Sequence, residues 1–309
     1  MLGLSTAWIA TEVDNGDRLL DALRETGLSA LELDYRVTAA MLQQMRRRLR
    51  SHEFSVLSVH NYCPLPEGVP QHQASGDLFR LSSTDPEERA RGVKLSLKSV
   101  HLAADLEARA VVFHLGEVAI DNPDNDRRLR QFFEDKLVDS DEAEAYRAER
   151  KAERRAKRQP FLDAVLLSLD RIHAEAVRLG VYLGVENRFY LHQIPDLEEV
   201  GIILNEFRGG NIGYWHDCGH AHVQACLGVT PHEAWLERYG AHLLGTHLHD
   251  ARGLKDHLAP GTGEIDFDLV ARYLGADTVR VIEVHPGTTV TEIHRAVALL
   301  QSKGIAEAA

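Results

Sequence analysis

The stretch YLGVENRFYLHQIPDLEEVGIILNEFRGGNIGYWHD, residues 182–217, contains the unit that decides the fold. A short apolar run, Tyr182–Glu186, precedes an amphipathic segment, Asp196–Phe207, and a second apolar run, Ile212–Asp217, follows. Nearly continuous apolar runs of five or six residues are typical of parallel strands that are covered on both faces. The stretch therefore predicts two parallel strands joined by a helix.

The same alternation repeats along the chain and predicts an α/β fold, the (β/α)8 barrel. An open doubly wound sheet is the alternative, but no Gly-rich G-x-G-x-x-G turn follows the first apolar run. The predicted strands are Leu2–Ala7, Ala30–Asp34, Ser55–His60, Ala110–His114, Tyr182–Glu186, Ile212–Asp217, Leu243–His247 and Val279–Glu283. The predicted helices are Asp14–Thr26, Thr38–Arg50, 85–107, Phe161–Leu179, Asp196–Phe207, His232–Tyr239, Asp266–Leu274 and Thr289–Gln301.

One long insertion, residues 118–160, interrupts this alternation after the fourth strand. It contains AEAYRAERKAERRAKRQ, residues 143–159, a strongly helix-forming segment rich in Arg and Lys. A solvated helix with ion pairs four residues apart is one interpretation. The alternatives are a lid, an oligomer contact or an anion-binding patch. We expect residues 1–309 to form one barrel domain that carries this helical insertion.

The composition excludes several classes of protein. The chain has 47 acidic and 35 basic residues and a net charge of -12, which opposes binding to nucleic acid and to anionic membranes. Three cysteines, Cys63, Cys218 and Cys226, form no paired framework, which fits a reducing cytosol. The first residues have no basic region, and no apolar run is long enough to span a bilayer. We therefore expect a cytoplasmic protein.

Potential metal ligands stand at the ends of six consecutive predicted strands. Glu186 and Glu283 lie at the ends of apolar runs, and an unpaired buried carboxylate costs several kcal/mol. A shared metal ion would neutralise both, and a network of salt bridges is the alternative. The strand ends carry His60, His114, Glu186, Asp217 with His220, His247 with His249, and Glu283. This mixture of imidazole and carboxylate suits Mn²⁺, Zn²⁺, Co²⁺ or Fe²⁺ better than Mg²⁺ or Ca²⁺.

The motifs VHNY, FHLG, GVENR, HDCGHA, HLHDARGLKDHLAPGTGEIDF and IEVHP together resemble the xylose isomerase-like barrel superfamily. This group holds sugar phosphate isomerases and epimerases, ketose 3-epimerases, inosose dehydratase and endonuclease IV. The resemblance covers nearly the whole chain apart from the insertion. It implies that Glu186, Asp217, His247 and Glu283 hold a metal ion, and that Glu186 and Glu283 also serve as the catalytic acid/base pair.

The resemblance also raises the question of how many ions bind. His60, His114, His220 and His257 match additional ligands that endonuclease IV uses for a zinc cluster. That family has an Asp two residues before the last His, where this chain has Lys255, although Asp256 or Asp250 could substitute. We therefore expect one ion, Mn, Zn or Co, with two or three ions as the alternative. With one ion, His60 and His114 would contact substrate or support the ligands.

Two enzyme hypotheses follow, and a barrel that binds metal and ligand without turnover is the third. The first is an isomerase, epimerase or dehydratase that removes a proton next to a metal-polarised carbonyl of a small keto sugar or polyol. The second is a zinc-dependent phosphodiesterase that cleaves abasic DNA. Its need for basic loops conflicts with the net charge, because the basic stretch Arg147–Arg158 is interleaved with acids.

Weaker expectations concern the substrate and the assembly. Arg188, two residues after Glu186, should face the same side of its strand and could reach a substrate hydroxyl or phosphate. His249, Tyr62 and Trp215 also stand near strand ends and are expected to contact the substrate, with packing as the alternative for the two aromatic residues. The oligomeric state stays open, with a homo-oligomer as one alternative because dimers and tetramers are common in the family that the motifs resemble.

Overall fold

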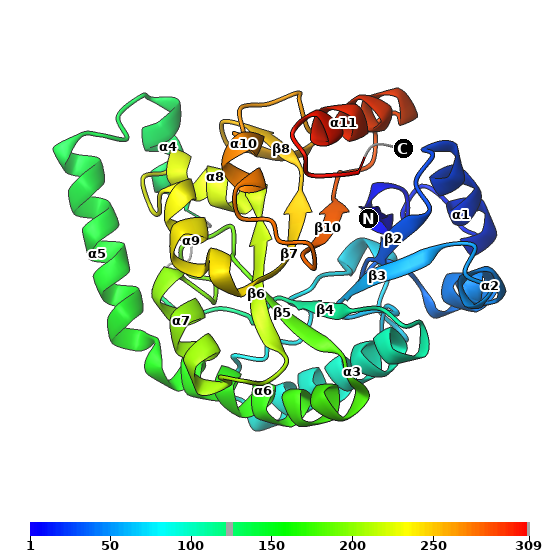
Figure 1. The fold of residues 1–309 in the computed structure, drawn as a ribbon. Helices are drawn as coiled ribbons and strands as arrows, with labels where there is room; N and C mark the ends of the chain where they lie inside the picture. Colours follow the sequence, from blue (N-terminus) through cyan, green and yellow to red (C-terminus); the bar gives the residue numbers. More distant parts are fainter. Residues whose placement is uncertain (122–125, 308–309) are drawn as a thin grey trace.

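The computed structural model describes residues 1–121 and 126–307 and shows a closed barrel of parallel strands (Figure 1). The order around the barrel is β1-β10-β7-β6-β5-β4-β3-β2. Each barrel strand therefore pairs with the barrel strands that precede and follow it in the chain, and β1 closes the barrel against β10. The predicted (β/α)8 barrel is confirmed. The barrel strands are β1 (Leu2–Ser5), β2 (Ala30–Leu33), β3 (Ser55–His60), β4 (Ala110–Phe113), β5 (Tyr182–Glu186), β6 (Ile212–Asp217), β7 (Leu243–Leu248) and β10 (Val279–Ile282).

Helices surround the barrel, and most begin at a side chain that caps the first free amides. Thr38 accepts from the Met41 amide, and Asp196 and Thr289 each form a capping box with a glutamate three residues on. No helix in the described ranges is both long and apolar enough to cross a membrane. The helices are α1 (Gly16–Glu25), α2 (Ala39–Arg50), α3 (Pro86–Asp105), α4 (Arg127–Glu134), α5 (Asp141–Lys157), α6 (Gln159–Leu179), α7 (Leu197–Glu206), α8 (Cys218–Cys226), α9 (His232–Tyr239), α10 (Phe267–Ala271) and α11 (Val290–Ser302).

Two elements near the carboxyl ends of the strands were not predicted. Helix α8 begins directly after Asp217, so the chain turns at Cys218 as soon as β6 ends. The segment after β7 forms an antiparallel hairpin of β8 (Asp250–Arg252) and β9 (Lys255–Leu258). Both elements place histidines over the mouth of the barrel.

Trp215 fills the inside of the barrel and thereby forms a floor beneath those strand ends. It packs with Val112, Leu244 and Val281 and is fully buried. Gly184 on β5 and Gly245 on β7 leave room for the indole, because a Cβ at either position would collide with the ring. Trp215 is therefore a packing residue, and it does not wall a ligand pocket as we expected.

The insertion lies outside the barrel as α4 and α5, with α5 beside α7, α8 and α9 (Figure 1). Residues 122–125 of the predicted insertion lie outside the described residues. Apolar side chains of α4 and α5, including Leu129 and Phe132, pack against Leu191 and Val223 of the barrel. Helix α5 carries an expected ion pair four residues apart, between Glu153 and Lys157, but it is not solvated on every side, because Ala143 and Arg154 are buried.

A buried ion pair joins α5 to the barrel. Arg154 is 3% exposed, and its guanidinium donates to both oxygens of Glu199 at 2.7 and 2.8 Å and to Asp196 at 2.6 Å. Glu199 is fully buried at the start of α7. Loss of the arginine would leave this carboxylate buried without its cation.

We expect Arg154→Ala to lower the free energy of unfolding by about 3–5 kcal/mol, because it removes one partner of a buried ion pair. Arg155→Ala is the matched control, since the Arg155 side chain is 72% exposed and lies 3.6 Å from Glu198. Urea denaturation of both variants measures the difference. Equal stability of the two variants would show that the buried pair does not hold α5 in place.

Candidate active site

A pocket of about 240 Å³ opens at the carboxyl ends of the barrel strands. The side chains around it come from the ends of β2, β3, β4, β5 and β10, from α8, from β9 and from the loop before α3. Its lining consists of Tyr35, Arg36, His60, Ser75, Asp77, His114, Glu186, Arg188, Gln193, His220, His257, Glu283 and His285. The pocket is thus lined mainly by charged and imidazole groups.

Four buried side chains converge at the bottom of this pocket. One ligand atom from each of Glu186, Asp217, His247 and Glu283 lies within 4.8 Å of the other three. His247 Nδ1 is 3.1 Å from Glu186 Oε1, 3.1 Å from Glu283 Oε2 and 3.6 Å from Asp217 Oδ2. A ring nitrogen carries at most one proton and cannot donate to three carboxylates. The arrangement therefore has the form of a metal ligand set.

Glu32 orients the histidine of this four-residue group. Its Oε2 atom lies 3.2 Å from His247 Nε2, and its carboxylate accepts hydrogen bonds from Ser5 Oγ at 3.1 Å and Ser58 Oγ at 2.7 Å. All four side chains are buried. A carboxylate on the far ring nitrogen fixes the tautomer and the orientation of a ligating imidazole. Sequence analysis placed Glu32 in a strand, but its contact with His247 could not be read from the spacing.

The carboxylates and the histidines shift one another's pKa values strongly. Burial alone would raise the pKa of Glu186, but His114 and His247 outweigh burial and hold it well below its ordinary value. Burial likewise opposes ionisation of Glu283, and His247 and His257 hold its pKa low. Burial would lower the pKa of His247, but Glu283 and other carboxylates raise it well above its ordinary value. These carboxylates are therefore ionised, and they favour a cation among them.

A second group of ligands stands beside the first and shares Glu186 with it. His114 Nε2 is 2.9 Å and His60 Nε2 is 3.6 Å from Glu186 Oε2. One ligand atom from each of these three residues lies within 4.8 Å of the other two. Asp77 Oδ2 lies 3.1 Å from His114 Nδ1 and accepts from Arg188 Nη2, also at 3.1 Å. Asp77 belongs to the irregular segment between β3 and α3, where no pattern marked it as a site residue.

A third group joins His220 on α8 to the β8–β9 hairpin. His220, Asp256 and His257 bring their ligand atoms within 4.8 Å of one another, and Asp256 Oδ2 is 3.1 Å from His257 Nδ1. Asp256, one of the two residues named above as substitutes for Lys255, therefore lies beside His257. Lys255 is exposed on β9.

Asp250, the other candidate substitute, has a different task. Its carboxylate accepts hydrogen bonds from the amides of Gly261, Gly263 and Ile265 at 2.8–3.0 Å, and so it shapes the loop after β9. A Cβ at position 263 would collide with this carboxylate and with the Ala251 backbone. This close approach explains the glycine there.

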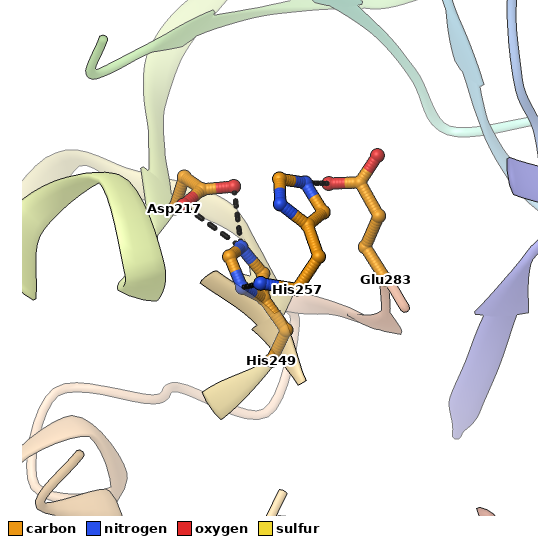
Figure 2. Close-up of side chains that lie close together, drawn as sticks. All are labelled: Asp217, His249, His257 and Glu283. Carbon is orange, nitrogen blue, oxygen red and sulfur yellow. Dashed lines mark hydrogen bonds and ion pairs between the residues drawn. The ribbon is translucent and has the colours of Figure 1, made fainter. Parts of the chain in front are cut away.

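Figure 2 shows how the hairpin connects Asp217 to Glu283. His249 Nε2 lies 3.0 Å from both carboxylate oxygens of Asp217, and His249 Nδ1 accepts from the backbone amide of His257 at 2.9 Å. The ring of His257 in turn lies 3.6 Å from Glu283 Oε2. His249 is fully buried beside Asp217. It does not line the pocket, but it joins Asp217, His257 and Glu283 in a further group of potential ligands whose ligand atoms lie within 4.8 Å of one another.

Comparison with known proteins fits this architecture. Residues 20–302 match the family described as "Xylose isomerase-like TIM barrel". The chain belongs to this family. A relative, "Uncharacterized protein y4fM" of Sinorhizobium fredii (strain NBRC 101917 / NGR234), is 26% identical over 277 residues, covering 84% of this chain and 77% of that protein. The resemblance inferred from the motifs is thereby confirmed at the level of the family.

Solved structures with the same fold include several sugar epimerases. A D-tagatose 3-epimerase-like protein is 17% identical with a TM-score of 0.68, over 98% of this chain and 96% of that chain. L-ribulose 3-epimerase is 17% identical with a TM-score of 0.64, over 100% of this chain and 87% of that chain. The 3-keto-D-glucoside 4-epimerase YcjR from E. coli is 14% identical with a TM-score of 0.67, over 97% and 98%. At these identities the likeness shows the fold.

The expected substrate contacts divide into two sets in this family member. Arg188 lines the pocket and donates to Glu186 Oε2 at 3.3 Å. Tyr62 is buried with its hydroxyl on the Phe79 carbonyl, and neither Tyr62 nor Trp215 is among the described residues that line the pocket. Six of the lining residues were not predicted from the sequence, because they lie in irregular segments outside the strands and helices: Tyr35, Arg36, Ser75, Asp77, Gln193 and His285.

The raised pKa of one histidine gives a test of this charge balance. Burial would lower the pKa of His257, but Asp256 and Glu283 raise it from 6.5 to about 10. A raised histidine pKa stabilises the fold below pH 6.5, and this stabilisation is lost as the pH rises toward 10. With chelator present, the free energy of unfolding should therefore fall across this range, and less steeply in His257→Gln. The control is His101→Gln, because His101 is an exposed residue of α3, and its slope should equal that of the wild-type protein. Equal slopes for His257→Gln and the wild-type protein would contradict the assignment.

Proposed function

We propose that this protein is a divalent-metal-dependent isomerase or epimerase that acts on a small keto sugar or polyol. The observation that carries the proposal is that Glu186 and Glu283 belong to one four-residue ligand group and also border the pocket. Two carboxylates in that position can hold a cation and exchange protons with a bound molecule. A dehydratase would use the same groups, with the second proton delivered to a leaving hydroxyl group that departs as water.

The residues at the bottom of the pocket fit a divalent ion. Glu186, Asp217, His247 and Glu283 would hold it, and the mixed nitrogen and oxygen ligands suit Mn²⁺, Zn²⁺ or Co²⁺. When bound, such an ion supplies Lewis acidity that polarises a carbonyl and stabilises the charge that develops on deprotonation of the adjacent carbon. Glu32 would keep the His247 ring in its ligating orientation.

The protein's own groups then divide the work of proton transfer. We assign to Glu186 and Glu283, at the ends of β5 and β10, the removal and the return of a proton on the carbon next to the carbonyl. Arg188 donates to Glu186, which favours the ionised form of that carboxylate. His60 and His114 border the same pocket, where they can bind substrate hydroxyl groups. Burial of both glutamates limits access of water to the reacting carbon.

The size of the pocket supports a small substrate. A volume of about 240 Å³ suits a molecule near the size of a monosaccharide, whereas a nucleic-acid duplex needs an open basic surface. The structural neighbours include proteins named for D-tagatose, L-ribulose and D-allulose. These three ketoses are therefore the first substrates to test.

The acid/base assignment predicts the behaviour of Glu283→Gln. The amide is close in shape but takes up no proton, so we expect solvent deuterium exchange into the ketose to fall at least about 100-fold. Proton NMR of the three ketoses with manganese-loaded enzyme in D₂O measures the exchange. Glu264→Gln is the control, because the Glu264 side chain is 53% exposed and does not line the pocket. Normal exchange in Glu283→Gln would refute the role of Glu283.

A second candidate function, hydrolysis of phosphodiesters by a metal cluster, is supported by one specific observation. Besides the central four-residue group, the pocket holds His60, His114 and Glu186 together, and His220, Asp256 and His257 together. Clusters of two or three ions are used to stabilise both the attacking and the leaving oxygen of a phosphate ester. The three groups could accept such a cluster.

The number of bound ions separates the two functions. Elemental analysis of protein purified without chelator should give about one Mn, Zn or Co per chain if the isomerase proposal is right. Two to three ions per chain, together with cleavage of an abasic-site duplex at low salt, would favour the hydrolase. His220→Ala is informative here, because it should lower the ion count only if the third group is occupied.

A further inference from the structure

A second cavity, of about 340 Å³, lies between the insertion helix α5 and the barrel, apart from the pocket at the strand ends. One wall is formed by basic side chains of α5, and the opposite wall by the start of α7, the segment 227–231 and α9. We call it the basic cavity. Five basic residues line it, Lys151, Arg154, Arg155, Arg158 and Arg238, against two acidic residues, Asp196 and Glu198.

This excess of positive charge stands out in a chain whose net charge is -12. Arg154 and Arg158 are matched by acids, since Arg154 binds Asp196 and Glu199 and Arg158 donates to both oxygens of Glu198. The other three basic residues, Lys151, Arg155 and Arg238, have no acidic partner of their own among the residues that the structure describes. They therefore remain available to a ligand.

Lys151 and Arg238 are the two basic residues of the cavity without any ion pair within residues 1–121 and 126–307. Lys151 Nζ donates to the Val229 carbonyl at 2.6 Å, and Arg238 lies over the Tyr239 ring at 5.5 Å. Within the described part of the chain, neither side chain forms an ion pair at 4 Å or less. Arg155 adds a third cation whose nearest acid, Glu198, is 3.6 Å away and already binds Arg158.

The surroundings of one of these cations, Lys151, disfavour its positive charge. Burial and the nearby Arg147 lower the pKa of Lys151. Arg154 is almost fully buried, and its Nε atom has no hydrogen-bond partner. Buried donors without partners and crowded cations both cost free energy unless an anion is present. The cavity thus has the excess of positive charge that an anion site needs.

We propose that the basic cavity binds a small phosphorylated molecule. Arg and Lys side chains on several elements can surround a phosphate group, and the guanidinium forks match its oxygens in pairs. The volume exceeds the need of a bare phosphate ion and leaves room for a small organic portion beside the apolar residues Leu191, Leu197 and Pro231. The insertion would then serve as one half of a ligand site.

The test uses the full chain with its metal retained and glycerol 3-phosphate, inorganic phosphate and glycerol as probes. Calorimetry measures affinity, and hydrogen–deuterium exchange reports where each probe binds. We expect glycerol 3-phosphate to slow exchange in α5 and in residues 227–231, and glycerol to have no effect. Phosphate that binds instead at the strand ends would alter exchange there equally in all variants.

The variant Arg155→Ala/Arg238→Ala removes two cations from the cavity. It should weaken glycerol 3-phosphate binding about tenfold or more, given the strength of hydrogen bonds to charged groups. Lys157→Ala/Arg128→Ala removes the same charge from residues that do not line the cavity and should bind normally. Lys151→Gln provides a second, single-site variant and should also weaken binding.

The outcomes separate the proposal from its alternatives. Tighter binding of glycerol 3-phosphate than of inorganic phosphate supports the proposal, and equal binding of the two would overturn it in favour of free phosphate. No slowing of exchange in α5 with either probe, or undiminished affinity in both cavity variants, would overturn the proposal. The result does not depend on turnover, so it stands apart from the test of Glu283.

Discussion

The concentration of buried negative charge at the barrel mouth is the constraint on which the rest of the site depends. Glu32, Glu186, Asp217 and Glu283 are all 6% exposed or less, and all four approach the single imidazole of His247. Such charges are tolerated only when cations or strong donors compensate them. Arg188, the metal ion that we propose and six histidines compensate this negative charge. The histidines are His60, His114, His220, His247, His249 and His257. Trp215 forms the dry floor that makes the requirement severe.

Much of this arrangement could be predicted from the sequence because barrel topology turns chain order into position. Glu186, Asp217 and His247 stand at the ends of apolar runs, and parallel strands bring such ends to one face. The fold and the eight-residue set of potential ligands therefore followed from local patterns. The family to which the chain belongs confirmed the interpretation of the motifs.

Other parts of the site depend on contacts that no local pattern reports. Asp77 meets His114 across 37 residues, and Arg154 meets Glu199 across 45. Asp256 lies beside His257 at 3.1 Å in the β8–β9 hairpin, which no pattern in the sequence predicts. Trp215 was misjudged because an aromatic residue next to a ligand can face either the pocket or the barrel interior. Irregular segments and packing choices of this kind are settled only in three dimensions.

The central claim is that Glu186, Asp217, His247 and Glu283 together hold a divalent ion used in proton transfer. Anomalous diffraction from manganese-soaked crystals, recorded near the metal edge, tests it most directly. The account predicts a strong peak bonded to all four side chains at the bottom of the pocket. A peak only at His60 and His114, or no peak among these residues at saturating metal, would contradict it.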